Sequence, residues 1–273
     1  MILSRVIAHV REQNWTAIAI DFVIVVAGVF LGLQVQQWSG ARARGEQGRA
    51  DEAHLRSVAT AELASVCGAR SYYATTRLSA DRALAMLNGA PGTDAELIVH
   101  AYRPTEAITF SAESGVYQSI VSAGRLDAVP NEALTTSLLE FFGSDALPQA
   151  YRDAHTAPYR IHVRRAMAHP VQEAIRRRCS DDRSGKVVSL VGTCALDVPA
   201  TDVARAAAAL RQDAEAARLL AEHYSLLSIL VNNADNRARG LAEGLTLPDA
   251  DDPCPGRARE PVLPTVTLAE RSP

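Results

Sequence analysis

An uninterrupted apolar segment near the N-terminus constrains this chain more than any other feature. Residues 16–35 read TAIAIDFVIVVAGVFLGLQV, with Asp21 as the only charged residue among them. A helix rises about 1.5 Å per residue, so about 20 residues cross a hydrocarbon layer of about 30 Å. Trp15 and Trp38 flank the segment, where tryptophan is common at membrane interfaces. We therefore predict a transmembrane helix over residues 15–38.

Two other interpretations of the apolar segment stay open from the sequence alone. A buried core helix has a similar composition, and Ser39 and Ala41 resemble the small residues of a signal-peptide cleavage site. The apolar run is longer than the core of a signal peptide and begins later in the chain, which favours a retained span. Residues 1–14 have apolar side chains at helical spacing, and we expect this amphipathic segment to lie along the membrane surface.

Asp21, Gly28 and Gly32 are predicted to share one face of the span. Steps of seven and four residues rotate a helix by only about −20° and +40°. The Gly28-x-x-x-Gly32 spacing permits close contact between helices, and an acid in an apolar stretch is costly unless it is paired, protonated or near an interface. We expect this face to mediate association in the membrane. The alternatives are the ordinary glycine content of a membrane helix and a carboxylate that reaches the headgroups.

The rest of the chain favours an all-α fold. Hydrophobic residues make up 48% of the sequence and aromatic residues only 5%, with much alanine and leucine, which favour helices. We expect residues 39–247 to form a soluble helical-bundle domain with long helices, and residues 248–273 to form a flexible tail. The expected helices cover residues 47–87, 94–102, 114–123, 130–142, 147–178 and 201–241, with a break at Ser39-Gly40, an interruption or kink near Pro170 and a helix cap at Thr201.

A turn at Gly124 connects two of these expected helices. We expect apolar residues on both sides of the turn to pack inward, namely Tyr117, Ile120, Leu126, Leu134 and Leu138. Gly124 could also shape a ligand pocket together with Tyr117 and Arg125. A tight helical connection explains the glycine without any ligand, so both interpretations stay open.

The four cysteines indicate an oxidising compartment. Fourteen residues separate Cys179 from Cys194, and the polar start of this segment lets the chain reverse as a loop or small hairpin. We predict a disulfide between these two residues that closes the small loop. Cys67 and Cys254 are then left as a second pair, with unpaired buried thiols as the alternative.

Two stretches of the chain carry a family resemblance. The first is residues 11–38. The second contains Tyr117-Gln118-Ser119-Ile120, Ser122-Ala123-Gly124-Arg125-Leu126, Asn131-Glu132-Ala133-Leu134 and the pair Phe141-Phe142. With these the sequence resembles a group of uncharacterised bacterial single-pass membrane proteins. The resemblance implies an anchored helical domain outside the cytoplasm. It gives no information about an activity.

The orientation in the membrane rests on opposing arguments. Arginine is more frequent after the predicted span, at Arg42, Arg44, Arg49 and Arg56, than before it, at Arg5 and Arg11. By the positive-inside rule this bias places the large domain in the cytoplasm. The cysteines and the resemblance favour the periplasm. We expect a bacterial inner-membrane protein with a periplasmic domain.

The sequence shows no strong catalytic motif: H-E-x-x-H, G-x-S-x-G, Walker, G-x-G-x-x-G and C-x-x-C patterns are all missing. His155, His162 and His169 recur every seven residues, but on one helix they would stand about 10.5 Å apart, too far to share one metal ion. We therefore predict no catalytic residue, cofactor or metal site. A net charge of −3 gives no general attraction to nucleic acid, and we expect none as a partner.

Two hypotheses about function follow. The first is an interaction or scaffold module whose partners are the lipid bilayer and either a second copy of the chain or a membrane-complex protein. The second is a membrane-tethered enzyme or ligand sensor with a pocket near Tyr117, Gly124 and Arg125. A pocket with convergent polar groups would favour the second hypothesis.

Overall fold

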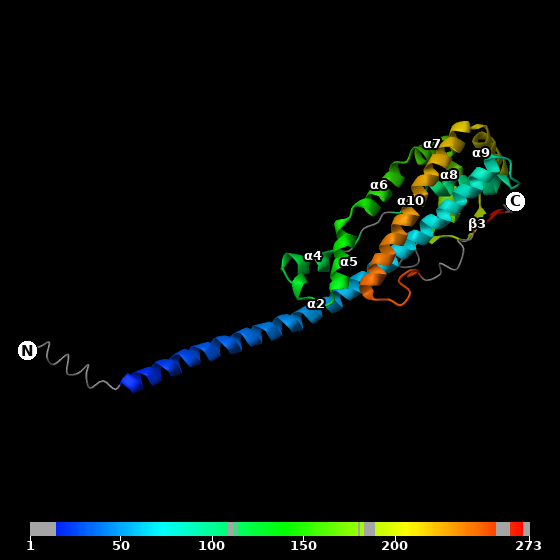
Figure 1. Ribbon diagram of the computed structural model, residues 1–273. Helices are drawn as coiled ribbons and strands as arrows, with labels where there is room; N and C mark the ends of the chain where they lie inside the picture. The colour runs from blue at the N-terminus through cyan, green and yellow to red at the C-terminus, as the bar shows by residue number, and fades with distance from the viewer. Residues whose placement is uncertain are drawn as a thin grey trace, which may run out of the picture.

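One helix, α2 (Trp15–Leu87), runs from the predicted membrane segment through the helical domain. The computed structural model describes residues 15–108, 112, 114–179, 181–182, 189–254 and 263–269, so the predicted membrane-surface segment 1–14 lies outside the described residues. The N-terminal part of α2 projects alone from the remaining elements (Figure 1). The helix is 73 residues long, which corresponds to about 110 Å.

The expected break in this helix at Ser39-Gly40 is wrong, because α2 continues through both residues. The sequence that follows, ARARGEQGRA, contains mostly strong helix formers, whereas a single glycine costs only about 1 kcal/mol in a helix. Arg42 also pairs with Glu46 one turn later, with Nε 3.0 Å from Oε1. The apolar N-terminal segment and the predicted helix 47–87 are therefore two parts of one continuous helix.

The remaining elements are short except for one. The expectation of an all-α class is confirmed, because helix dominates the described residues. After α2 come α3 (Asp94–Tyr102), η1 (Arg103–Thr105), α4 (Gly115–Ser122), η2 (Leu126–Ala128), α5 (Glu132–Gly143), α6 (Ala146–Thr156), α7 (Pro158–Ala166), α8 (His169–Arg178), α9 (Ala200–Gln212) and α10 (Ala214–Leu245).

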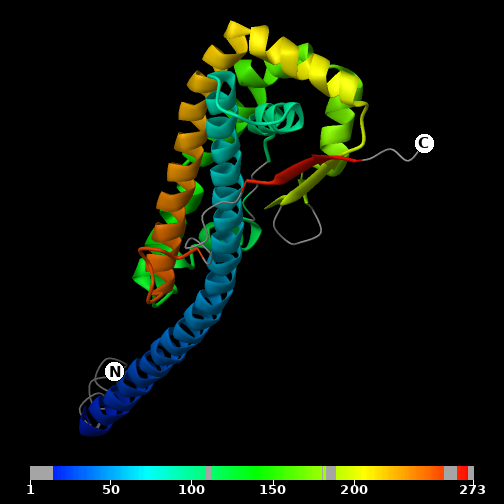
Figure 2. The same cartoon turned by 90° about the vertical axis from the view of Figure 1, so that its right-hand side faces the viewer.

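The two long helices, α2 and α10, lie side by side and run in opposite directions (Figure 2). Their contact buries two successive apolar clusters. The lower core, nearer the projecting helix, contains Leu55, Ala59 and Val66 of α2, Leu134 and Leu138 of α5, and Ala238 and Leu241 of α10. The upper core contains Tyr73 and Ala80 of α2, Leu97 and Ile98 of α3, Tyr159 and Val163 of α7, Ile175 of α8, and Leu220 and Leu227 of α10.

The connection between α4 and α5 follows the sequence-based expectation. Gly124 ends α4 with a φ of 63°, a conformation that glycine adopts without the strain of a side chain. Four of the apolar residues expected to pack inward are buried and Leu126 is partly buried; the four are Tyr117, Ile120, Leu134 and Leu138.

We predict that Gly124→Val lowers the free energy of unfolding by about 1–2 kcal/mol. A Cβ atom at this position meets nothing within 4 Å, so the loss comes from the backbone alone. Gly124→Asn is the matched control, since asparagine tolerates positive φ and should cost much less. Urea unfolding of the three proteins, followed by circular dichroism, measures the difference. A valine variant as stable as the wild type contradicts the prediction.

Two expected helices are in fact interrupted. The segment expected over 147–178 forms α6, α7 and α8. The break at Met167-Ala168 corresponds to the interruption expected near Pro170, whereas the break at Ala157 was not expected. Pro158 disfavours the helical conformation at Ala157, whose ψ is 134°. The segment expected over 201–241 turns sharply at Asp213, between α9 and α10 (Figure 2). Thr201 lies inside α9 and does not cap it.

Short strands and two disulfides complete the fold. β1 (Asp181–Asp182) pairs antiparallel with β2 (Ser189–Leu190), and β3 (Thr193–Leu196) pairs parallel with β4 (Thr265–Leu268). The expectation of disulfide bonds is confirmed: Cys179 is joined to Cys194 and Cys67 to Cys254. The segment 248–273, expected to be a flexible tail, is attached at two points. One is Cys254, through the second cysteine pair considered from the sequence, and the other is β4, whose pairing with β3 the sequence did not predict.

Candidate functional site

The projecting part of α2 has apolar side chains exposed on all sides. Val25, Leu31 and Val35 are each more than 60% exposed, and Trp38 is 67% exposed. Among the described residues, one helix is long and apolar enough to cross a bilayer, and it is this one. A signal sequence near the N-terminus has the same properties as an anchor, so the length and composition support either.

The three residues predicted to associate in the membrane, Asp21, Gly28 and Gly32, all belong to this exposed part of α2. A Cβ atom at Gly28 or Gly32 would meet nothing within 4 Å, so both glycines leave open surface on the isolated chain. Because α2 is unbroken here, their helical spacing is kept. Their association with another helix stays a prediction.

The residues of the predicted pocket have partners within the domain. The Tyr117 ring stacks on Phe142 with 4.6 Å between ring centroids. The Arg125 Nε donates to Asp51 Oδ2 at 2.8 Å, and the Asp51 side chain is almost fully buried. Tyr117 and Arg125 thus tie α4 and η2 to the domain. A ligand site at these residues and Gly124 stays a prediction, and the hollows described next lie elsewhere.

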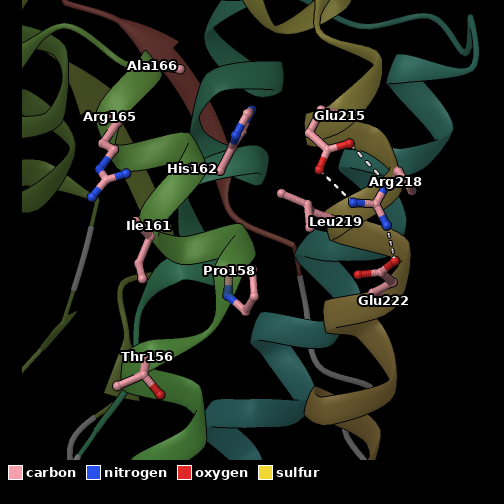
Figure 3. Close-up of a pocket in the computed structure, with 10 residues that line it drawn as sticks. All are labelled: Thr156, Pro158, Ile161, His162, Arg165, Ala166, Glu215, Arg218, Leu219 and Glu222. Atoms are coloured by element: carbon pink, nitrogen blue, oxygen red, sulfur yellow. Dashed lines mark hydrogen bonds and ion pairs between the residues drawn. The ribbon is translucent and has the colours of Figure 1, made fainter.

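A groove runs between α7 and α10 on the upper half of the domain (Figure 3). It has a volume of about 800 Å³. His162 and Leu219 point toward it from opposite sides, and Pro158 is the first residue of α7. The residues that line it are Thr156, Pro158, Ile161, His162, Arg165, Ala166, Glu215, Arg218, Leu219 and Glu222.

A second hollow of about 310 Å³ continues this groove downward, toward α6. It shares Thr156, Pro158, Leu219 and Glu222 with the groove, so the two form one surface depression. We call this second space the lower hollow; its other lining residues are Asp153, Ala157, Tyr159, His223 and Leu226. The break before Pro158 separates α6 from α7 at this point, and the depression lies along that break.

The wall that α10 contributes is a row of paired charges. Arg218 lies between Glu215 and Glu222 and bonds both carboxylates (Figure 3). At the upper end, His162 Nε2 lies 2.7 Å from Asp213 Oδ2, and Asp213 also accepts the Ala216 N–H that begins α10. Burial raises the pKa of Asp213, but these hydrogen bonds outweigh it, so the pKa lies below its usual value. Asp213 is therefore ionised at neutral pH.

The lower hollow has a buried histidine among its lining residues. His223 is only 5% exposed, and its ring stacks on Tyr159 with 5.5 Å between centroids. Its Nε2 lies 2.7 Å from the Pro104 carbonyl oxygen, so Nε2 carries the proton and donates, and Nδ1 is left as an acceptor. Burial lowers the pKa of His223, and the bond to Pro104 opposes this only in part. The ring is therefore neutral at neutral pH.

A buried polar network around η1 links the groove side of the domain to the disulfide loop. Arg103 is 1% exposed and donates to the carbonyl oxygens of Cys179 and Val191. Arg164 donates to the Thr105 hydroxyl and carbonyl oxygens, at 2.9 and 3.1 Å. The sequence analysis missed this network. The only signal was an arginine placed directly before Pro104 at the end of an apolar helix.

The three histidines considered as a metal site do not share a helix. His155, His162 and His169 belong to α6, α7 and α8. Within the part of the chain that the structure describes, no three side chains from His, Cys, Asp or Glu are grouped closely enough to hold a metal ion. The groove is a candidate binding surface because apolar and charged side chains line it together.

Comparison with known proteins returned no match to a family model, to a curated protein or to a solved structure.

Proposed function

We propose that this protein is a docking module anchored in a bacterial inner membrane by one transmembrane helix, with its helical domain in the periplasm. The observation that carries the proposal is the continuity of α2. Its first part is exposed and apolar, and its later part supplies the core of the domain. One rod therefore fixes both the membrane attachment and the position of the domain.

The exposure of the apolar side chains favours a span over a buried helix. A core helix of a soluble protein is covered by its own fold, but no part of the most apolar window of α2 is buried. An exposed apolar band of this size is unstable in water and stable in a bilayer. We assign the span to residues 15–38 and the domain to residues 39–247, arranged as a helical bundle around α2, α5 and α10.

The distance along α2 between the span and the domain is short, so the anchor also sets the position of the domain. From Trp38 to Gly48, where α2 becomes buried, the helix rises by about 15 Å. Gly48 lies so close to Ala128 that an added Cβ would overlap its carbonyl group. The domain is thus held at a fixed height above the bilayer.

The disulfides support the periplasmic side. Cys179, Cys194 and Cys254 are all buried in their pairs, as expected for structural bonds formed in an oxidising compartment. The arginines that follow the span, Arg42 and Arg44 among them, favour the opposite orientation. We give the disulfides more weight than the arginines, because two separate cysteine pairs must each form a bond and both bonds require an oxidising compartment. Self-association through Asp21, Gly28 and Gly32 is part of the same proposal.

The anchor is tested by placing charge in the span. We expect Val26→Arg combined with Phe30→Arg to release the chain from membranes, because each arginine costs about 2.5–3.5 kcal/mol at the bilayer centre. Val26→Leu with Phe30→Leu is the matched control and should remain bound. Alkaline extraction of membranes shows which proteins remain bound. The intact mass of the wild-type chain shows whether the apolar segment is retained.

The wild type should resist extraction and keep its full mass of 29.2 kDa. A shorter wild-type product that has lost the apolar segment would identify a cleaved signal sequence and contradict the anchor. Extraction of the full-length wild type would contradict it as well.

A further inference from the structure

We propose that the lower hollow binds an apolar residue of a partner peptide that is followed directly by lysine or arginine. This inference rests on the proposed docking function and specifies the chemistry of the partner. The lower hollow is the part of the depression that combines an apolar lining, acidic side chains and a buried hydrogen-bond acceptor.

The lining of the lower hollow suits an apolar side chain. Pro158 and Ala157 come from the start of α7, and Leu219 and Leu226 come from α10. Its volume of about 310 Å³ is at the small end of ligand sites, which commonly enclose about 300–1,000 Å³. It has room for one large side chain and the backbone on either side.

The charge of the lower hollow selects a cation. Asp153 of α6 and Glu222 of α10 are its only charged lining residues, and both are acidic. The Glu222 side chain is 58% exposed and binds Arg218 on the side of the upper groove (Figure 3). Asp153 accepts only the amide of Gln149 in its described contacts, at 2.8 Å. Two carboxylates on opposite sides of an apolar space complement a lysine or arginine beside an apolar residue.

His223 adds an acceptor without adding repulsion. Its Nε2–H is occupied by the Pro104 carbonyl, so Nδ1 is the ring nitrogen that remains as an acceptor. The ring is neutral and therefore does not oppose a bound cation. A backbone N–H or a side-chain N–H of the partner peptide fits this requirement.

The open shape favours a peptide as the occupant. The lower hollow continues into the upper groove, and apolar surface extends beyond both ends, at Ile161 of α7 and Ile229 of α10. These two side chains are 41% and 50% exposed. A chain that enters and leaves the hollow can cover both, whereas a small ligand would leave them in water.

The test uses the full-length protein in nanodiscs of zwitterionic phosphatidylcholine. The probes are two soluble peptides, acetyl-Leu-Leu-Lys-amide and acetyl-Leu-Leu-Glu-amide, followed by saturation-transfer NMR with empty nanodiscs as the blank. We expect the lysine peptide to bind about tenfold more tightly than the glutamate peptide. Glu222→Gln and Asp153→Asn should each weaken the lysine peptide about twofold to fivefold, the effect of one exposed charge pair.

Two further variants separate the site from general effects. Leu226→Ser should weaken both peptides, because it removes apolar lining. Glu132→Gln removes a carboxylate on α5, outside the depression, and should leave binding unchanged. Equal binding of both peptides, or lysine-peptide binding that Glu222→Gln and Leu226→Ser leave intact, overturns the inference. Absence of lysine-peptide binding by a chain that resists alkaline extraction overturns this inference alone, whereas extraction of the wild type overturns the proposed function.

Discussion

Replacing Arg103 by methionine is expected to lower the free energy of unfolding by about 3–5 kcal/mol. The guanidinium is 1% exposed and donates through Nη2 and Nε to the Cys179 carbonyl oxygen, at 3.3 and 3.4 Å. It also donates to the Val191 carbonyl oxygen. Burial lowers the pKa of Arg103 and the nearby Glu106 carboxylate opposes that shift, so the two charges stabilise each other. Methionine would leave two carbonyl groups without this donor and Glu106 without this countercharge.

The matched control is Arg177→Met. Arg177 lies near the same disulfide loop and bonds Asp197 at 2.8 Å, but its side chain is 52% exposed. Water replaces the lost contacts at an exposed site, so we expect little change in stability. Urea unfolding at neutral pH, followed by circular dichroism, compares the two variants with the wild type. Equal losses in the two variants would show that Arg103 has no special role.

The second large effect is expected from removing the disulfide between Cys67 and Cys254. These residues are 187 positions apart, and in the chain-entropy model a cross-link over so long a loop stabilises the fold by about 5 kcal/mol. The Cys179–Cys194 bond, across 15 positions, corresponds to about 3 kcal/mol. Cys67→Ser with Cys254→Ser should therefore cost more than Cys179→Ser with Cys194→Ser.

Urea unfolding without reductant measures both double variants. Reduced wild type provides the control, because it should be less stable than either variant under oxidising conditions. Thermal unfolding should rank the two double variants in the same order by their midpoint temperatures. A Cys67/Cys254 variant that unfolds like the oxidised wild type would contradict the assignment of this bond as a structural tie between α2 and the segment after α10.

Local signals predicted some of the local elements, although the predictions at Ser39-Gly40 and Thr201 were wrong. Helix α3 begins after Thr93, which accepts the Glu96 N–H while the Glu96 side chain accepts the Thr93 N–H, and Pro104 limits its other end. The turn at Gly124 was likewise readable, because its positive φ calls for glycine. In both places the determining residues lie within a few positions of the element.

Non-local features were not readable in the same way. The parallel pairing of β4 with β3 joins segments about 70 residues apart, and four residues of tail contain no sign of their partner. The depression between α7 and α10 depends on how α6 and α7 pack after the break at Ala157. Pro158 predicts such a break, but no local pattern indicates which helix packs opposite α7. Arg103 was missed for the same reason, since its acceptors are far away in sequence.

The most direct test of the anchored, periplasmic arrangement is topology labelling combined with non-reducing peptide mass spectrometry. Thr201→Cys places one new thiol on the exposed surface of α9, while the four native cysteines stay paired. A membrane-impermeant maleimide is added to cells whose outer membrane alone has been opened. We expect labelling at residue 201, together with linked Cys67–Cys254 and Cys179–Cys194 peptides. Labelling only after the inner membrane is opened, with free thiols at the native positions, would contradict the arrangement.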